Sequence, residues 1–183
     1  FTVNGITQPN RNLLLWRDPG VDGIKTGHHS KAGYCLMSSA QRGDQRLIAV
    51  VMGSTSERQR ADDSMALLNW GFRFFETHRL YEPGKPVAQL KVWKGKADQV
   101  QLGVTGPLLV SVPRGRYAEL KPAMEVPRSL VAPIAAGQEI GTVKVSLDGK
   151  VVAQAPLVAV SAVEEGGFFK RLWDAFWMWW ESV

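Results

Sequence analysis

The stretch Val21-Asp22-Gly23-Ile24-Lys25-Thr26-Gly27-His28 is the most informative part of this 183-residue chain. It follows the turn signal Asp18-Pro19-Gly20 and is predicted to be extended. On such a strand, Lys25 and Thr26 supply hydrogen-bond donors to an anion, and Gly27 lets a bound peptide backbone come close. This edge can therefore receive a peptide carboxylate. Alone, these three residues are weak evidence, because an exposed lysine at the start of an ordinary strand gives the same sequence.

Two strands and a long helix are predicted to follow. Residues 34–40 and 46–52 have the pattern of strands, and the connection 41–45 contains the glycine that a hairpin needs. From about residue 57 to residue 77, apolar residues recur at the spacings of one helix face: Ala61, Met65, Leu68, Phe72 and Phe75. Ser54 and Glu57 are expected to form a capping box. These elements make a layered α/β unit that is too small to be closed, so part of its sheet is expected upstream.

A second, all-β domain is predicted after residue 82. The composition changes at Glu82-Pro83-Gly84-Lys85-Pro86, and Asp148-Gly149 marks a tight hairpin. The candidate strands are residues 86–92, 100–102, 108–112, 139–147, 151–153 and 157–160. We expect residues 83–165 to form a small β sandwich or barrel. Gly166-Gly167 then separate a last segment, residues 168–183, which holds four of the seven tryptophans.

Composition and charge narrow the function classes. An apolar fraction of 45% is enough for a core, and the formal charge of +5 with a pI near 9.5 favours anionic partners. The basic residues are scattered and no nucleic-acid-binding signature is present, so no nucleic acid partner is expected. The lone Cys35 excludes an intrachain disulfide and is expected to be buried. The chain starts at Phe1 with no signal sequence and is interpreted as truncated or processed.

No metal or cofactor is predicted. His28 and His29 are adjacent and would point apart on a strand, His78 is distant, and no cysteine or carboxylate completes a ligand set. Residues 133–145 have some character of a biotinyl or lipoyl carrier domain. No lysine stands at a candidate hairpin tip with acidic or methionine neighbours, so a carrier function is not favoured.

Residues 21–28, continuing into Ala32-Gly33-Tyr34, resemble the third active-site motif of the serine-type D-alanyl-D-alanine carboxypeptidases, the low-molecular-mass penicillin-binding proteins. The resemblance extends over essentially the whole chain, and its parts follow one another in the order found in the family. They are residues 1–5, 8–12, 14–16, 46–53 and 67–71, followed by the β domain and the aromatic tail. It implies that residues 1–82 are the C-terminal part of an α/β catalytic domain of the transpeptidase and β-lactamase type. Residues 83–165 would be a β sandwich, and residues 166–183 an amphipathic membrane-anchoring helix.

The resemblance also implies an activity and its partners. In this family the serine of an S-x-x-K motif attacks the penultimate D-alanine carbonyl of a peptidoglycan stem peptide, and β-lactams acylate the same serine. A second motif, S-x-N, assists proton transfer. Neither motif occurs in this chain, so both are expected on a missing N-terminal part of the same protein, and the chain alone is expected to be inactive. The alternatives are a non-catalytic, membrane-associated cell-wall module and, less suitably, a related β-lactamase.

The resemblance assigns roles to individual residues. Lys25 would tune the site electrostatically and relay a proton, and Thr26 would bind the terminal carboxylate beside Gly27. The backbone N–H of His28 would complete the oxyanion hole. Arg60 would pair with the free C-terminus of the substrate, as a planar guanidinium suits a carboxylate, with Arg58 as the alternative. Without the resemblance, both arginines are ordinary solvated charges near the start of a helix.

The last segment is predicted to be an amphipathic helix. At 100° per residue, one face collects the apolar side chains Phe168, Phe169, Leu172, Trp173, Phe176, Trp177, Trp179 and Trp180. Lys170, Asp174 and Glu181 fall on the opposite side, with Arg171 nearby. The segment is too short and too charged to span a bilayer and is expected to lie flat on the periplasmic surface of the bacterial inner membrane. The alternative is a helix that packs on the β domain or on a partner.

Overall fold

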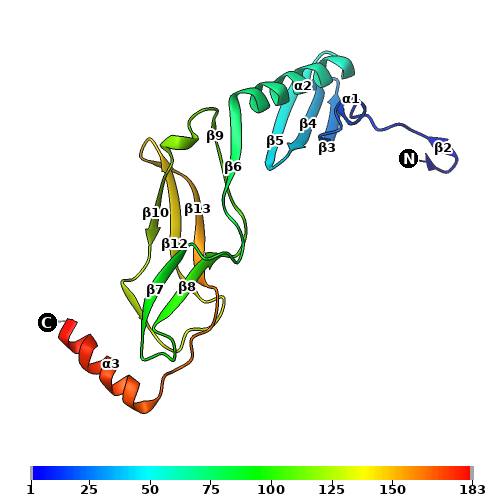
Figure 1. The fold of residues 1–183 in the computed structure, drawn as a ribbon. Helices are drawn as coiled ribbons and strands as arrows, with labels where there is room; N and C mark the ends of the chain where they lie inside the picture. Colours follow the sequence, from blue (N-terminus) through cyan, green and yellow to red (C-terminus); the bar gives the residue numbers. More distant parts are fainter. Residues whose placement is uncertain (1, 182–183) are drawn as a thin grey trace. The chain divides into compact units, whose positions relative to one another are not determined.

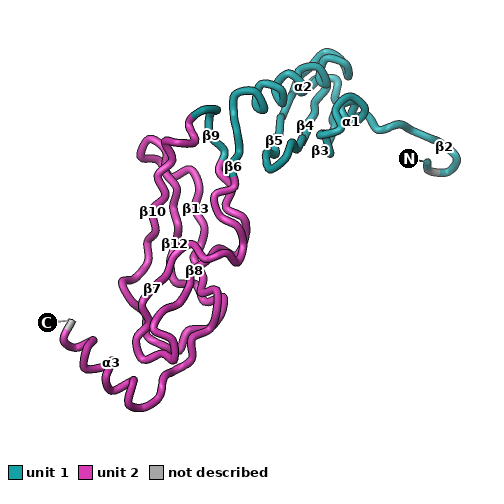
Figure 2. The backbone as a smooth tube through the Cα atoms, in the orientation of Figure 1, with its two compact units in different colours: residues 1–78, 111–115 teal, residues 79–110, 116–183 magenta. Residues whose placement is uncertain are grey.

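A computed structural model describes residues 2–181 of the chain. These residues divide into two compact units (Figure 2). The first comprises residues 2–78 together with Ser111–Gly115, and the second comprises Arg79–Val110 together with residues 116–181. Each unit is described by itself.

The first unit is a three-stranded antiparallel sheet with a long helix on one face (Figure 1). The strands are β3 (Val21–His29), β4 (Gly33–Arg42) and β5 (Gln45–Ser54), in that order, and the helix is α2 (Glu57–Phe74). Before them come the short pair β1 (Thr2–Val3) and β2 (Ile6–Thr7) and the one-turn helix α1 (Leu14–Arg17). The core between sheet and helices contains Leu14, Val21, Leu36, Ala40, Ala49, Ala61, Leu68 and Phe72.

The predicted hairpin and helix of this unit are present. Arg42 pairs with Gln45 across a two-residue turn, in which Gly43 has the left-handed φ of 59° that such turns favour. The helix begins at the predicted residue 57 but ends at Phe74, where the chain becomes strand β6. The predicted cap is wrong. Ser56 is the N-cap and accepts a hydrogen bond from the Gln59 N–H at 3.0 Å, whereas Ser54 donates to the Asp63 carboxylate.

The opposite face of this sheet is left open within the described residues. Alternation along β5 turns Ala49 and Val51 toward α2 and leaves Ile48, Val50 and Met52 exposed. Met37, the partner of Val50 on β4, is also exposed. The sheet therefore presents an apolar face to solvent in the part of the chain that the structure describes.

The second unit is built on a six-stranded sheet of order β10-β12-β13-β8-β7-β11. Its strands are β7 (Ala88–Trp93), β8 (Gln99–Val104), β10 (Lys121–Glu125), β11 (Ser129–Val131), β12 (Glu139–Leu147) and β13 (Lys150–Ala159). All neighbouring pairs are antiparallel except β7 and β11, which are parallel. The turn η1 (Tyr117–Glu119) precedes β10. Strands β6 (Phe75–Tyr81) and β9 (Leu108–Pro113) form a separate two-stranded sheet, and the bounds of the two units fall within these strands.

The hairpin of β12 and β13 turns at Asp148-Gly149, as predicted, with left-handed φ values of 52° and 74°. The two short strands expected at 151–153 and 157–160 are one continuous strand, β13. The unit has its own core, which includes Val92, Val100, Leu102, Val143, Val145 and Leu157. Helix α3 (Phe168–Glu181) follows it, while residues 182 and 183 of the predicted tail helix, with residue 1, lie outside the described residues.

Candidate functional site

The Lys-Thr-Gly motif lies on β3, which is an edge strand of the sheet. The Asp18 turn starts the strand: the Asp18 carboxylate accepts from the Gly20 N–H at 2.8 Å, which lowers the pKa of that carboxyl. On the inner side β3 pairs with β4, with Thr26 opposite Leu36 and Gly27 opposite Cys35. Within the described residues its outer edge is unpaired, so an extended peptide can lie along it.

An open cavity of about 460 Å³ lies against this strand. Its lining residues come from three segments, 8–15, 22–28 and 57–60, and include all four predicted motif residues and Arg60. The cavity also contains Arg11, for which no role was predicted. Of its two carboxylates, Glu57 pairs with Arg60, and Asp22 accepts from Arg46, which lowers the pKa of Asp22.

The positive charge of the cavity is carried by Arg11 and Lys25. Neither side chain forms an ion pair with any residue in the described part of the chain. Lys25 is exposed, and its ammonium group donates to the Thr26 carbonyl at 2.8 Å. Two cations beside an edge strand attract a carboxylate or another anion.

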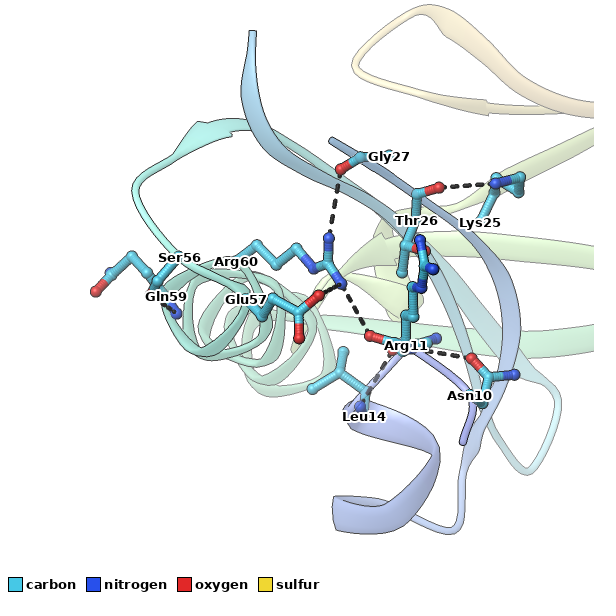
Figure 3. Close-up of polar contacts among 11 residues, drawn as sticks. Asn10, Arg11, Leu14, Lys25, Thr26, Gly27, Ser56, Glu57, Gln59 and Arg60 are labelled. Atoms are coloured by element: carbon cyan, nitrogen blue, oxygen red, sulfur yellow. Dashed lines mark hydrogen bonds and ion pairs between the residues drawn. The ribbon is translucent and has the colours of Figure 1, made fainter. Parts of the chain in front are cut away.

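Arg60 enters the cavity wall from the first turns of α2 (Figure 3). Its side chain is only 2% exposed. Nη1 donates to the Gly27 carbonyl at 3.3 Å, and Nη2 donates to the Arg11 carbonyl at 2.9 Å and to Glu57 at 3.3 Å. The other candidate, Arg58, is 85% exposed and lies 3.9 Å from Asp62. The structure thus brings Arg60, and not Arg58, to the motif, with much of its guanidinium committed to main-chain carbonyls.

The contact between Arg60 and Gly27 orients a particular peptide group. The Gly27–His28 peptide is trans, so its C=O and N–H point in opposite directions. Because the C=O faces Arg60, the His28 N–H faces away from Arg60. The His28 ring stacks on Tyr34 at a centroid distance of 4.1 Å, and the Arg60 guanidinium lies 5.6 Å from the same Tyr34 ring.

The segment before α1 is joined to β3 by Asn12, which is buried. Its amide nitrogen donates to the Gly23 carbonyl at 3.2 Å, and its amide oxygen accepts from the Leu14 N–H at 3.1 Å. This residue holds the Arg11 segment beside the motif. Arg11, Asn12 and Tyr34 were not predicted as site residues, and the only available signal was their place in segments of the family pattern.

Within residues 2–181 no group of three or more His, Cys, Asp or Glu side chains is arranged to hold a metal ion. Cys35 lies on β4 and is half-buried rather than buried as expected.

Two family profiles match the chain. The profile described as D-alanyl-D-alanine carboxypeptidase matches residues 1–56, and the profile described as Penicillin-binding protein 5, C-terminal domain, matches residues 75–165. The chain therefore belongs to the D-alanyl-D-alanine carboxypeptidase family, as its motif resemblance indicated.

Individual relatives agree with this assignment. D-alanyl-D-alanine carboxypeptidases DacC and DacA of Escherichia coli (strain K12) are 46% and 47% identical over 176 residues, which are 95% of this chain and 44% of each relative. The crystal structure of penicillin binding protein 5 from Haemophilus influenzae, at 44% identity, superposes with a TM-score of 0.78 over 90% of this chain and 49% of that one. The chain thus spans less than half the length of the relatives it matches.

Proposed function

We propose that this chain supplies the Lys-Thr-Gly strand of a serine D-alanyl-D-alanine carboxypeptidase, which removes the terminal D-alanine of peptidoglycan stem peptides and is acylated by β-lactams. The observation that carries the proposal is the cationic cavity along the outer edge of β3, where Lys25, Thr26 and the Arg60-bound Gly27–His28 peptide meet. Residues 1–82 belong, in this proposal, to the catalytic domain, and residues 83–165 are the β domain that follows it.

The reaction follows from these positions. A serine on another part of the protein bonds to the penultimate carbonyl carbon, and the carbonyl oxygen becomes an oxyanion that the His28 N–H stabilises. A donor of this kind is worth about 2.7–4 kcal/mol. The peptide C–N bond then breaks, D-alanine leaves with a proton, and water hydrolyses the acyl ester and returns a proton to the serine.

The residues of this chain bind and orient. Thr26 and Lys25 receive the terminal carboxylate, and Lys25 also relays a proton near the serine. Arg60 adds positive charge behind the strand and aligns the Gly27–His28 peptide. The backbone at Gly27 leaves room for the peptide to approach.

The nucleophile belongs, in this proposal, to an N-terminal part of the same protein. Two observations support this: no S-x-x-K or S-x-N sequence occurs in the 183 residues, and the sheet has an exposed apolar face with Met37, Ile48, Val50 and Met52. The chain alone is then inactive. The absence of these two motifs also favours one alternative, a non-catalytic cell-wall protein that keeps only the membrane-associated β domain and a relic of the catalytic fold.

Fluorescent penicillin tests the proposal. The 183-residue chain is expected neither to be labelled nor to release D-alanine from a D-alanyl-D-alanine peptide, and both activities are expected when the N-terminal part of the parent protein is joined to it. Labelling of Ser30, Ser38 or Ser39 in the chain alone would contradict the assignment of the nucleophile. A folded full-length protein that is not labelled would favour the non-catalytic alternative.

We also propose that α3 anchors the protein to the periplasmic surface of the bacterial inner membrane. Its eight large apolar side chains are between 40% and 83% exposed: Phe168, Phe169, Leu172, Trp173, Phe176, Trp177, Trp179 and Trp180. Within residues 2–181, no helix combines the length and the apolar character needed to cross a bilayer. Phenylalanine and tryptophan on one face suit a helix that lies in the interface.

A further inference from the structure

The polar side of α3 contains a buried acidic residue. Asp174, in the middle of the helix, is only 5% exposed. Its carboxylate accepts a hydrogen bond from the backbone N–H of Lys94 at 2.6 Å. Lys94 stands in the turn between β7 and β8, where its φ of 60° lies in the left-handed region. Asp174, on the polar side of the helix, is therefore in contact with the β domain and is shielded from solvent.

The segment before α3 contacts the same turn. Gly166 donates its N–H to the Lys94 carbonyl at 2.8 Å, and Lys96 donates its N–H to the Glu164 carbonyl at 2.8 Å. A Cβ at Gly166 would lie 2.9 Å from the Gly95 carbonyl oxygen, so this close approach needs a glycine. Both backbone groups of Lys94 are thus bound by the tail, the carbonyl by Gly166 and the N–H by Asp174.

Ion pairs add to these contacts. Lys170 lies 2.5 Å from Asp98 in the same turn and 3.5 Å from Asp174, and Arg171 lies 2.8 Å from Glu165. The pairing with Asp98 raises the pKa of Lys170. Each charged side chain of α3 that the structure describes therefore has a partner in the second unit.

These contacts affect the stability of helix α3 in water, before the protein binds a membrane. α3 has 14 residues, and an isolated helix shorter than about 12–15 residues is marginal in water even with favourable composition. Tertiary contacts normally supply the missing stability. Here they come from the polar side, so the apolar side chains do not have to be buried for the helix to form.

We propose that the turn of residues 94–98 clamps α3 by its polar side and holds the aromatic face outward as a preformed docking surface for a lipid bilayer. The assignment of the bilayer as the partner rests on the anchoring function proposed above. Phe169, Trp173 and Trp180 share a face that carries no charged side chain, so it offers a lipid interface apolar area without specific polar contacts. The clamp fixes the β domain to the anchor and removes the need to fold the helix on the membrane.

Hydrogen–deuterium exchange of the whole chain in lipid-free buffer tests the clamp. Backbone amides of residues 171–179 are expected to be protected in the wild type. In Asp174→Ala their exchange is expected to become faster by about tenfold or more, because the Lys94 hydrogen bond is lost while the aromatic face is unchanged. Glu125→Ala removes an exposed carboxylate of the same domain and is the matched control. Unchanged protection of β12 and β13 in each variant shows that the domain stays folded.

The outcomes distinguish the proposed clamp, in which residues 94–98 hold α3, from the proposed binding of α3 to a membrane. An unprotected tail in the wild type, or equal exchange in Asp174→Ala and wild type, overturns the clamp. Flotation with vesicles of phosphatidylethanolamine and phosphatidylglycerol then tests the partner: binding by the wild type supports the bilayer. A protected tail that fails to float would leave the clamp in place and refute the bilayer as its partner.

Discussion

Arg60, at 2% exposure, is the largest of the almost fully buried side chains that the structure describes, and its contacts decide how it can act. A guanidinium has five N–H donors in a fixed plane, so it can bind several main-chain carbonyls at once. In this protein it binds those of Gly27 and Arg11, one in the motif strand and one in the segment beside it. The residue therefore orients the cavity wall in addition to contributing charge. A lysine could not reproduce this geometry.

In the full-length enzyme, Arg60→Ala is expected to reduce both peptide turnover and penicillin acylation. The loss should be about 1.5–3 kcal/mol in transition-state stabilisation, the value of a hydrogen bond to a charged group. In the proposed mechanism both reactions use the His28 N–H as the oxyanion donor, and Arg60 contacts the peptide that carries this group. Arg58→Ala is the control, because that side chain is 85% exposed, and it should stay within about 0.5 kcal/mol of wild type.

Steady-state hydrolysis and stopped-flow acylation measure these effects. If peptide turnover falls and acylation is unaffected, Arg60 acts on the substrate carboxylate directly. If Arg58→Ala has the larger effect, the carboxylate site lies at Arg58 and the alignment argument is wrong.

A second ionic group, in the β domain, predicts a pH effect. The guanidinium of Arg116 contacts Glu119 and Asp148, and these hydrogen bonds lower the pKa of both carboxyls. A carboxyl whose pKa is lowered by folding contributes stability above its ordinary pKa of about 4 and loses this contribution as the pH falls through its folded value. Arg116→Gln should therefore destabilise the domain at pH 7, and its difference from the wild type should shrink as the pH falls below about 4 and through the lowered pKa values of the two carboxyls. Urea unfolding at pH 7 and at a series of lower pH values measures the difference, and Arg128→Gln is the control.

At the scale of the elements, close backbone contacts limit which residues the strands of the β domain can accommodate. At Gly141, where the pairing of β12 shifts register, an added Cβ would collide with the Glu125 carbonyl oxygen of the neighbouring segment. A main-chain atom in a sheet cannot rotate away as a side chain can. The glycine is therefore required by packing, although its φ is not left-handed.

Gly141→Ala is expected to destabilise the chain by about 1–3 kcal/mol, the usual cost of overpacking. Gly106→Ala is the matched control, since a Cβ added there would meet nothing within 4 Å and the φ of Gly106 is not left-handed. Thermal unfolding followed by circular dichroism compares the two variants. Equal melting temperatures would mean that the sheet relaxes at this point.

Sequence patterns correctly predicted the elements that have distinctive turn residues or a clear helical spacing of apolar residues. The hairpins at Gly43 and Asp148-Gly149 and the start of α2 follow from turn residues and helical spacing. Strand β10 was missed because its sequence, Lys121-Pro122-Ala123-Met124-Glu125, contains a proline and two charges, and β6 because Phe75 continues the helical spacing of α2. In these places long-range pairing determines the structure.

The same limit holds for the candidate site. The motif residues Lys25, Thr26, Gly27 and His28 and the more distant Arg60 line one cavity. The partners of Arg60 are main-chain carbonyls, which every residue carries, so no sequence pattern distinguishes them. The burial of Asp174 was missed for a similar reason, because its hydrogen-bond donor is the backbone N–H of Lys94.

At the scale of the whole chain, the two proposed functions lie in different units, so separate mutations can test them. The cavity lies in the first unit, whereas α3 and its clamp belong to the second. Removing the tail should therefore affect where the protein is found and leave the chemistry of the β3 edge unchanged.

A chain that ends at Gly166 is expected to lose membrane association and stay folded. The deletion removes eight large apolar side chains that are largely exposed and do not belong to either buried core cluster. Each such side chain contributes roughly 1.5–3 kcal/mol to the free energy of binding when it moves from water into the membrane, before the cost of ordering it. The apolar face of the helix therefore contributes far more to membrane binding than a single salt-dependent charge contact would. Vesicle flotation of both chains measures the loss. Trp173→Ala with Trp177→Ala should weaken flotation in the intact chain, whereas Arg128→Ala should not. Equal flotation of the full and shortened chains would place the membrane contact elsewhere on the protein.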